Sequence, residues 1–441
     1  MLVNIHKLSL FLLLILIGLN TASAQIWTLQ QCIDTAQSNN KNLKMSRNNV
    51  SIGEQKHKEA KANLIPKITA NAEYRYYTNL PYQLMPLSAF GGPAGEYKAI
   101  QFGVPNLINA NLQLTMPIYD PQVYGAIQTT EIASEMKELE FQKTGEQIYF
   151  EISNFYFNAQ ILDNQLAFID SNLANAERLL KNTQLLNEQL LAKVTDVSKV
   201  KLQVSQLLVQ KESVSSKLEQ VLNALKFSMG VSTDQNIQIE PDIQFTKATN
   251  YTGSTTLDIK IAKKQNSLLN SEINTLTKSR FLPSLKLIGS YGTSGFGYYG
   301  QPKAFVDFYK IGFAGIQLSL PIFDGTVTQQ KIDQKNLELQ NNELQYSFLK
   351  EQNYMQTENA EQQMKVALNS VDVTTEQIEL AQTIYEQTII QQEQGIASLT
   401  DILLADNALR EAQQTYLSAV IDYLKADLEL KKLTGNIPAI K

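Results

Sequence analysis

Apolar and polar residues alternate strictly along two segments in the first half of the chain. Every second residue is apolar between Lys67 and Tyr77, and the same alternation returns between Ile108 and Ile118. Weaker versions run from Leu285 to Tyr291 and from Ile316 to Leu320. A period of two residues places alternate side chains on opposite faces of a β-strand. The pattern therefore predicts four strands, each with one apolar and one polar face.

Four two-faced strands are compatible with two kinds of sheet. About ten alternating residues per strand is typical of a transmembrane β-barrel with a polar lumen. A sheet that covers the core of a water-soluble protein on one side has the same alternation. The segments between the paired strands, Leu80–Pro105 and Gly292–Tyr309, are rich in Gly, Pro and Tyr and are predicted to be long loops.

Long helices are predicted to follow the strands. From Ile152 to Leu180, apolar residues recur at alternating steps of three and four, which predicts a coiled-coil seam. The run from Gln122 to Leu191 has no proline, and a helix of that length reaches roughly 100 Å. A compact domain does not need so long a rod, whereas a membrane-anchored protein that crosses a periplasmic gap does.

The last helical segment has the clearest heptad pattern. One heptad position holds Ile402, Leu409, Tyr416, Tyr423 and Leu430, and the companion position holds Ala405, Ala412, Ala419, Ala426 and Leu433. The same register, about 205 residues earlier, gives Val197, Val204, Leu218 and Leu225 with Val200, Leu207, Val214 and Val221. Lys211 is the one break. Both segments are predicted to form antiparallel coiled coils with the long helices before them.

The chain is a tandem duplication of one strand-and-helix unit. Leu114-Thr-Met-Pro-Ile-Tyr-Asp120 is matched by Leu318-Ser-Leu-Pro-Ile-Phe-Asp324, about 205 residues later. Glu188-Gln-Leu-Leu-Ala-Lys-Val-Thr-Asp-Val197 is matched at nearly the same offset by Glu393-Gln-Gly-Ile-Ala-Ser-Leu-Thr-Asp-Ile402. The predicted domains are a first repeat (25–230), a linker or equatorial segment (231–254), a second repeat (255–435) and a C-terminal tail (436–441). The predicted fold class is mainly α with a small β part.

The first residues have the pattern of an export signal. Lys7, an apolar stretch from Leu8 to Leu19 and the small residues Ala22-Ser-Ala24 predict a signal peptide over residues 1–24. A retained membrane helix is the alternative, although the apolar run is shorter than the ~20 residues that a span requires. The lone cysteine, Cys32, follows bulky residues, which favours a packed position in the first helix over lipidation.

Composition and motifs narrow the possible functions. The net charge is −5, whereas a nucleic-acid-binding surface is basic, so no nucleic-acid partner is expected. Beyond the signal peptide the only histidine is His57, which lies in a Lys-rich stretch and is predicted to be a solvated surface residue. The sequence has no Cys/His cluster, phosphate loop or G-x-S-x-G motif. No cofactor, metal site or catalysis is therefore expected, and the protein is predicted not to be an enzyme.

The order of these features resembles the TolC-type outer-membrane efflux family. The features are Leu-Pro before a first strand, Met116-Pro-Ile-Tyr-Asp120 ending a second, a long helix, a Thr-Asp tip and a complete second copy. The resemblance implies a homotrimer in which four strands from each subunit close one transmembrane β-barrel and the helices form a periplasmic α-barrel. It also implies a channel of a tripartite efflux or type I secretion system in the bacterial outer membrane. The implied partners are a periplasmic adaptor (membrane fusion) protein, an inner-membrane RND, ABC or MFS pump, and outer-membrane lipid.

The resemblance also assigns roles to the tips of the helical hairpins. In the second copy Gly395 and Asp401 match the family pattern, whereas in the first copy Leu190 stands where the glycine is expected. The expected adaptor-contacting residues are Leu190, Leu191, Thr195, Asp196, Gly395, Ile396 and Thr400.

Two residues are expected at the inner constriction of the pore, namely Asp401 and Leu404. Asp401 matches an acid of the family's constriction, while Leu404 replaces a second acid. The gate is therefore either an acidic ring or a leucine ring that closes by dewetting. The alternative role for Asp401 is an N-cap of the following helix.

Charged residues on the polar face of the strands are expected to line the barrel lumen. They are Lys67, Glu73, Arg75 and Lys286. Because their signs are mixed, no strong charge selectivity is predicted there. Two other functions stay open, namely a trimeric outer-membrane-anchored coiled-coil structural or adhesive protein, and an exported coiled-coil chaperone. The duplicated antiparallel hairpin argues against the first, since adhesins tend to use one parallel stalk.

Overall fold

The computed structural model describes residues 26–243, 251, 253, 255–300 and 303–438. The expected signal peptide, part of the expected linker and the end of the expected tail lie outside the described residues. The chain divides into two compact units, each assembled from segments that are far apart in the sequence. The first unit takes in residues 1–49, 138–261 and 346–441, and the second takes in residues 50–137 and 262–345.

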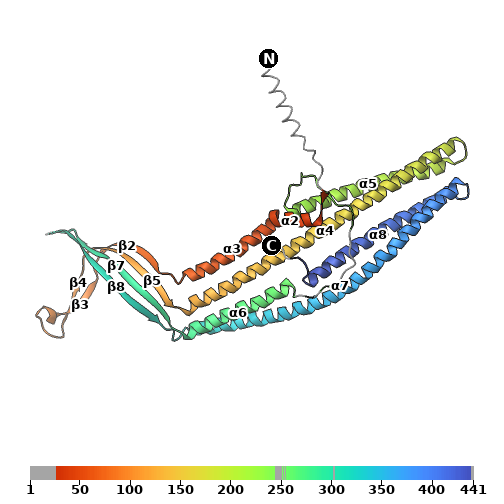
Figure 1. The fold of residues 1–441 in the computed structure, drawn as a ribbon. Coiled ribbons are helices and arrows are strands. Elements are labelled where there is room, and N and C mark those ends of the chain that lie inside the picture. The colour runs from red at the N-terminus through yellow and green to blue at the C-terminus, as the bar shows by residue number, and fades with distance from the viewer. Residues whose placement is uncertain (1–25, 244–250, 252, 254, 301–302, 439–441) are drawn as a thin grey trace, which may run out of the picture. The chain divides into compact units, whose positions relative to one another are not determined.

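The second unit contains an antiparallel sheet of four strands. They are β2 (Lys67–Tyr76), β5 (Asn106–Tyr119), β7 (Ser284–Tyr298) and β8 (Phe305–Ser319). The strands lie in the order β2-β5-β7-β8, so each half of the chain contributes one adjacent pair (Figure 1). The four predicted strands are confirmed.

The register gathers the predicted polar residues on one face of the sheet. Lys67 of β2 is paired with Thr115 of β5. Lys286 of β7 is paired with Pro117, two residues beyond Thr115 and therefore on the same face. The intervening alternation places Glu73 and Arg75 on that face as well. The opposite face carries the apolar set, including Ile68, Ala70, Leu112, Leu114, Ile316 and Leu318.

The prediction of a long loop over residues 292–309 is wrong, because β7 continues to Tyr298 and β8 begins at Phe305. One of the glycines that suggested a loop is the cross-strand neighbour of an aromatic ring. Gly295 is the register partner of Phe308, and a Cβ at Gly295 would lie 2.6 Å from that ring. A glycine at such a position makes room for the aromatic side chain on the neighbouring strand. Composition alone does not distinguish this arrangement from a flexible connection.

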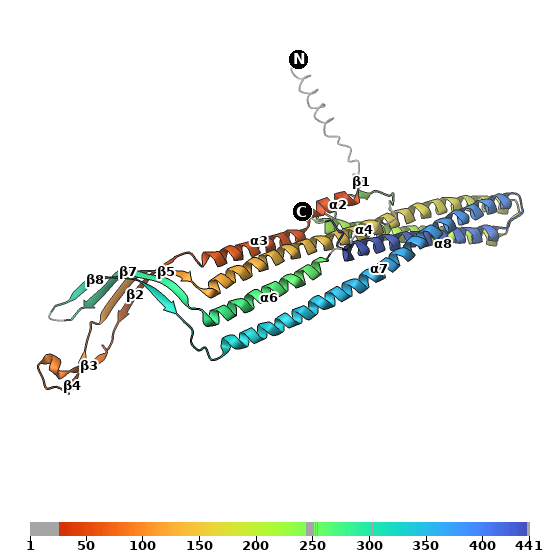
Figure 2. The ribbon, with the colours of Figure 1, turned by 60° about the horizontal axis from the view of Figure 1, so that its bottom comes forward.

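The loop predicted over residues 80–105 is also partly ordered into a β-hairpin. It contains β3 (Tyr82–Pro86), the 3₁₀ helix η1 (Leu87–Phe90) and β4 (Tyr97–Gln101), with β3 and β4 antiparallel (Figure 2). Each strand has five residues, and prolines and glycines surround them. Such short strands among turn-forming residues leave little periodic pattern to recognise.

Four helices have segments in the second unit. They are α3 (Lys41–Ala62), α4 (Pro121–Glu188), α6 (Leu257–Phe281) and α7 (Val327–Glu393). The imidazole of His57 on α3 is half-buried, with Nδ1 3.2 Å from the Ile127 carbonyl oxygen of α4. The prediction that His57 is a solvated surface residue is therefore wrong, because the ring packs between two helices.

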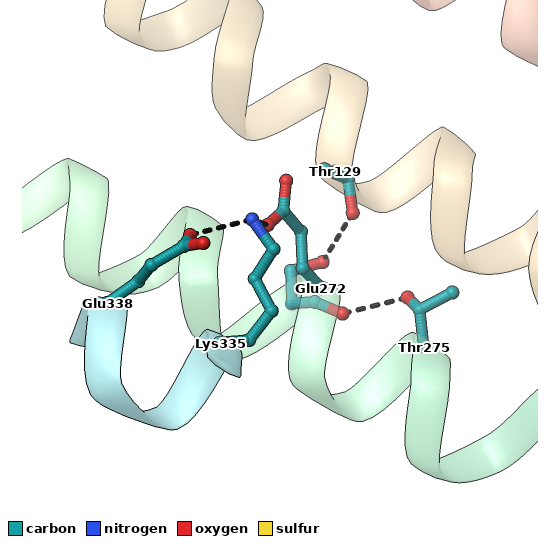
Figure 3. A network of polar contacts seen from close by, with 6 residues as sticks. Thr129, Glu272, Thr275, Lys335 and Glu338 are labelled. Carbon is teal, nitrogen blue, oxygen red and sulfur yellow. Dashed lines mark hydrogen bonds and ion pairs between the residues drawn. The ribbon is translucent and has the colours of Figure 1, made fainter. Parts of the chain in front are cut away.

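A network of polar contacts joins the helices of the second unit. Figure 3 shows Lys335 of α7 between Glu272 of α6 and Glu338 of its own helix, at 2.9 and 2.7 Å. Nearby, the hydroxyl of Thr129 on α4 lies 3.0 Å from the hydroxyl of Ser271 on α6. These contacts connect helices from both halves of the chain.

The first unit is built around two antiparallel helical hairpins. The first pairs α4 with α5 (Val194–Met229), and the second pairs α7 with α8 (Leu399–Leu433), as both ribbon views show (Figures 1 and 2). α4 and α7 contain 68 and 67 residues, which confirms the long helix predicted over residues 122–191. Among the described residues, no helix combines the length and the apolar character needed to cross a membrane.

The predicted heptad residues form the core of each hairpin. Ile402, Leu409 and Tyr423 of α8 pack with α7 and are at most 2% exposed. Leu207 and Val214 of α5 pack with α4 in the same way and are at most 4% exposed. Burial of such side chains is the main source of stability of a coiled coil. The predicted seams are confirmed.

Lys211 interrupts the seam on α5 without opening it. Its side chain is 45% exposed, and Nζ lies 2.6 Å from the Asp170 carboxylate of α4. The apolar stem of a lysine covers the seam while its charge stays at the water boundary. An ion pair this exposed adds at most about 1 kcal/mol to the stability of the fold. The hairpin is therefore stabilised mainly by the apolar residues next to Lys211 in the seam.

The first described segment packs into the same unit. Its elements are β1 (Ile26–Trp27), which pairs in parallel with β6 (Gln238–Ile239), and α2 (Leu29–Asn39). A capping box begins α2, since the Thr28 hydroxyl accepts from the Gln31 backbone and the Gln31 side chain accepts from the Thr28 backbone. Cys32 is fully buried, which confirms its packed position, and burial raises the pKa of its thiol to about 12.

Candidate functional site

The two helical hairpins end in the same kind of turn, residues 189–193 in the first and 394–398 in the second. In both, the second and third turn residues donate backbone hydrogen bonds of 2.8–2.9 Å to carbonyls of the preceding helix. The donor–acceptor pairs are Leu190–Asn187 and Leu191–Leu186 in the first tip, and Gly395–Gln392 and Ile396–Gln391 in the second. This pattern matches the left-handed cap that commonly ends helices.

The second residue of each turn has a left-handed backbone. φ is +64° at Leu190 and +74° at Gly395. Glycine adopts this conformation freely, whereas a residue with a side chain is strained by about 1–3 kcal/mol there. The first tip therefore keeps the turn geometry of the second although it lacks the expected glycine, and it stores backbone strain at Leu190.

The tips differ in the apolar surface that they expose. In the first tip Leu190 is 92% exposed, Leu191 73% and Val194 70%. In the second tip Ile396 is 72% exposed, and Gly395 has no side chain. Thr195 and Thr400 are exposed at the start of the following helices. The expected adaptor-contacting residues thus form two apolar ends, and the first is the larger.

Asp401 takes part in the cap of α8 but is not the N-cap residue. Ser398 is the N-cap, and its backbone N–H donates to the Asp401 carboxylate at 2.8 Å while its hydroxyl donates at 2.7 Å. These two bonds, the hydroxyl first, hold the pKa of Asp401 below its ordinary value. In the first copy the Lys193 backbone N–H donates to Asp196 at 3.3 Å, so both acids close their turns.

Leu404 lies one helical turn beyond Asp401 and is 63% exposed. Asp401 is exposed as well. Residues three apart on a helix share a face, so both side chains point away from the hairpin seam on neighbouring positions. One subunit thus presents a carboxylate and a leucine together, the pair that the sequence suggests for the constriction.

Buried polar side chains connect the two hairpins, a feature that the sequence reasoning missed. Asp406 of α8 accepts a hydrogen bond of 2.5 Å from the Gln203 amide of α5, and its carboxylate ion-pairs at 2.9 Å with Arg410. One heptad further along α8, Gln413 accepts from Asn172 of α4 at 2.7 Å. Asp406 and Gln413 each follow a seam alanine, which is the signal that marks the edge of the seam as a second packing face.

The expected lumen residues on the sheet carry paired charges. The Arg75 guanidinium lies 2.5 Å from the Glu73 carboxylate, and Lys286 Nζ lies 3.9 Å from Asp120. Lys67 donates to the side chain of Asn63 at 2.9 Å. Pairing of opposite charges weakens the field that this face presents.

Four strands and two long, capped helical hairpins, with two strands and one hairpin from each half of the chain, are the architecture of an outer-membrane channel protein. The sequence profile of the outer membrane efflux protein family matches residues 32–231 and 256–436, and the chain belongs to this family. The protein is therefore an outer-membrane efflux channel and not an enzyme, as the sequence predicted.

Individual relatives are distant but match over nearly the whole chain. The chain is 22% identical to the outer membrane protein TolC of Escherichia coli, over 97% of this chain and 86% of that protein. It is 21% identical to the toluene efflux pump outer membrane protein TtgF of Pseudomonas putida, over 92% of this chain and 83% of that protein.

Solved structures share the fold. The outer membrane protein VceC of Vibrio cholerae superposes with a TM-score of 0.72 at 15% identity, covering 92% of this chain and 96% of that chain. The CmeC outer membrane channel of Campylobacter jejuni superposes with a TM-score of 0.75 at 17% identity, covering 92% and 85%. The predicted mainly α fold with a small sheet is confirmed.

Proposed function

We propose that the chain is the outer-membrane channel of a tripartite efflux or type I secretion system and works as a homotrimer. The supporting observation is the order of the sheet, β2-β5-β7-β8, in which β2 and β8 are edge strands. An unpaired edge exposes backbone N–H and C=O groups that need partners, and four strands are too few to close on themselves. Pairing of β2 with β8 of the next copy satisfies both edges and closes a transmembrane β-barrel.

The barrel face with Lys67, Glu73, Arg75 and Lys286 becomes the lumen in this proposal. Its paired charges make the lumen weakly selective. The apolar face then contacts outer-membrane lipid, and the helices form a periplasmic α-barrel. The two segments matched by the family profile support the proposed division into two repeats, 25–230 and 255–435.

The hairpin tips are the proposed contacts with a periplasmic adaptor protein, which joins the channel to an inner-membrane RND, ABC or MFS pump. They end the longest helices and carry exposed apolar side chains at Leu190, Leu191 and Ile396. Large exposed apolar groups gathered at one point are typical of a protein contact. The polar residues Thr195, Asp196 and Thr400 begin the helices behind them.

Asp401 and Leu404 are the proposed constriction of the pore. Three Asp401 carboxylates around a threefold axis repel one another, which raises their pKa. The bonds from Ser398 act in the opposite direction, because they lower the pKa of each Asp401 carboxyl. An acidic ring attracts cations, and the adjoining leucines narrow the opening beside it.

A deletion strain with a complementing plasmid tests the proposed function. Loss of the channel is expected to raise ethidium accumulation in cells, and the full-length chain is expected to restore efflux. Native mass spectrometry of the detergent-solubilised protein is expected to give a trimer. If deletion leaves ethidium efflux and protein export unchanged but abolishes surface attachment, the channel proposal fails and the adhesive alternative replaces it.

A further inference from the structure

Leu190 has an unfavourable backbone conformation that its turn does not require. Among the described residues, Leu190 and Thr326 are the two non-glycine residues with positive φ. The second tip makes the same turn, with the same hydrogen bonds, around Gly395. A glycine at position 190 would therefore build the first tip without strain. Turn geometry gives no reason for a leucine.

Packing within the subunit gives no reason for the leucine either. Its side chain is 92% exposed, the second highest value among the exposed large apolar residues of the described chain after Ile322 at 94%. A side chain so exposed adds almost nothing to the stability of its own fold. Leu191 and Val194 beside it are 73% and 70% exposed, so the first tip ends in a cluster of three apolar side chains.

A second difference between the tips concerns charge. Lys193, exposed beside the apolar cluster, stands where the second tip has Ser398. Asp196 lies behind it and pairs with Lys199 at 3.6 Å. The exposed Glu188 at the end of α4 has a counterpart, Glu393, in the second tip, so Lys193 is a cation that the first tip adds beside its apolar end. The complementary surface is an apolar socket with an acid facing Lys193.

We propose that Leu190 is the side chain with which the first tip enters an apolar socket of the periplasmic adaptor, in which an acid faces Lys193, and that the first tip makes the stronger of the two contacts. This inference rests on the proposed function, which supplies an adaptor at the tips. Burial of one leucine strengthens a contact by about tenfold to a hundredfold, so a single residue sets which tip dominates.

Four variants of the full-length channel in its native host test the role of Leu190. Leu190→Asn removes the apolar group and keeps a residue that tolerates the left-handed conformation, and Leu190→Gly removes group and strain together. Leu190→Met keeps an apolar side chain. Leu208→Ala, at a 49% exposed leucine of α5 outside the tip, is the matched control.

Ethidium efflux is expected to fall toward the rate of the deletion strain for Leu190→Asn and Leu190→Gly, and to stay normal for Leu190→Met and Leu208→Ala. Single-channel conductance in planar bilayers and the melting temperature of the trimer are expected to be unchanged or, for Leu190→Gly, slightly raised. Wild-type efflux by Leu190→Asn in a strain where deletion abolishes efflux overturns this inference alone. A lower trimer melting temperature for both polar and glycine variants also overturns it, because Leu190 then contacts a neighbouring copy.

The reciprocal variant tests the ranking of the two tips. Gly395→Leu introduces the same strained residue into the second tip, where a Cβ meets no atom within 4 Å. It is expected to restore part of the efflux lost in Leu190→Gly, because it rebuilds an apolar end on a tip of the same geometry. Efflux loss that is larger for Ile396→Asn than for Leu190→Asn contradicts the ranking.

Discussion

Asp406 is a buried carboxylate whose loss has a cost that the structure allows to be worked out. Its side chain is 4% exposed. The carboxylate accepts a hydrogen bond from Gln203 of the other hairpin and forms an ion pair with Arg410 of its own helix. Asp406→Ala leaves the Gln203 amide, in a residue only 6% exposed, without its acceptor. An unsatisfied buried amide costs about 1–3 kcal/mol.

Loss of the ion pair with Arg410 adds less to the cost of Asp406→Ala than loss of a fully buried ion pair would. Breaking a buried ion pair costs about 3–5 kcal/mol when the remaining charge stays away from water. The Arg410 side chain is 22% exposed and turns to solvent after the substitution, so most of that penalty is avoided. The expected total for Asp406→Ala is about 3 kcal/mol, which is roughly a hundredfold in a local opening equilibrium.

Native-state hydrogen exchange followed by mass spectrometry measures this opening directly. Amides of α5 around Gln203 and of α8 around Asp406 are expected to exchange about a hundredfold faster in Asp406→Ala. Asp406→Asn retains an acceptor and is expected to lose less. Glu411→Gln removes an exposed carboxylate from the same stretch of α8 and is the control. Unchanged protection in Asp406→Ala refutes the view that this side chain holds the hairpins together.

The pH dependence of the same opening gives a second test. Burial raises the pKa of Asp406 above its ordinary value of 3.8, and the Arg410 and Gln203 contacts only partly reverse this. The folded state then binds the proton more tightly than the open state does, so opening becomes easier as the pH rises from about 3.8 through the folded pKa. Burial, followed by the charge of Asp406, raises the pKa of the adjacent Tyr385 to about 12, which keeps its hydroxyl neutral over this interval. Asp406→Asn is expected to flatten the slope.

Three further predictions follow from the tips and the sheet. Asp401→Ala is expected to change single-channel conductance or its block by multivalent cations in planar bilayers, and no change in either removes Asp401 from the constriction. Ser398→Ala removes a cap hydroxyl and is expected to weaken the start of α8 by about 1 kcal/mol, seen as faster amide exchange in its first turn only. Gly295→Val places side-chain atoms where the Phe308 ring lies, so the heat-stable folded band on gels is expected to melt at a lower temperature, whereas Gly315→Val, with open space around its Cβ, is expected to melt as the wild type.

Sequence periodicity correctly predicted the parts of the fold in which the same kind of contact repeats along an element. The heptads at Ile402 and Leu409 meet the same partner helix at every turn, and both residues are buried as predicted. The alternation at Lys67 and Glu73 likewise reports one sheet face. Where a residue serves a contact that does not repeat, the pattern fails, as at Gly295, whose role depends on the ring of Phe308 on the neighbouring strand.

The candidate site was predicted in position but not in detail. The duplicated motif located both tips, and the capped turns are there. The motif did not reveal that Leu190 adopts the glycine conformation, because backbone strain has no sequence pattern. The alternative prediction, that Asp401 is the N-cap of α8, is wrong by three residues, because Ser398 is the N-cap and Asp401 is its partner in a capping box. In the sequence, a capping box and a single acidic N-cap look alike, since both place an acid near the start of a helix. Asp406 was overlooked because its burial depends on the other hairpin.

α8 makes different kinds of contact on its two packed faces, one towards α7 and the other towards the first hairpin. Towards α7 the contacts are apolar, and opening that seam exposes side chains such as Tyr423 and Leu409, which are at most 2% exposed. Towards the first hairpin, Asp406 and Gln413 accept hydrogen bonds from Gln203 and Asn172. One heptad beyond Gln413, the same face carries Val420, which is fully buried. Water replaces a hydrogen bond at small net cost but does not replace apolar contact. Around Asp406 and Gln413, the contact between the two hairpins is therefore easier to open than the seam within each hairpin. Substitutions at Asp406 are for this reason expected to affect the contact between the hairpins and leave the seams intact.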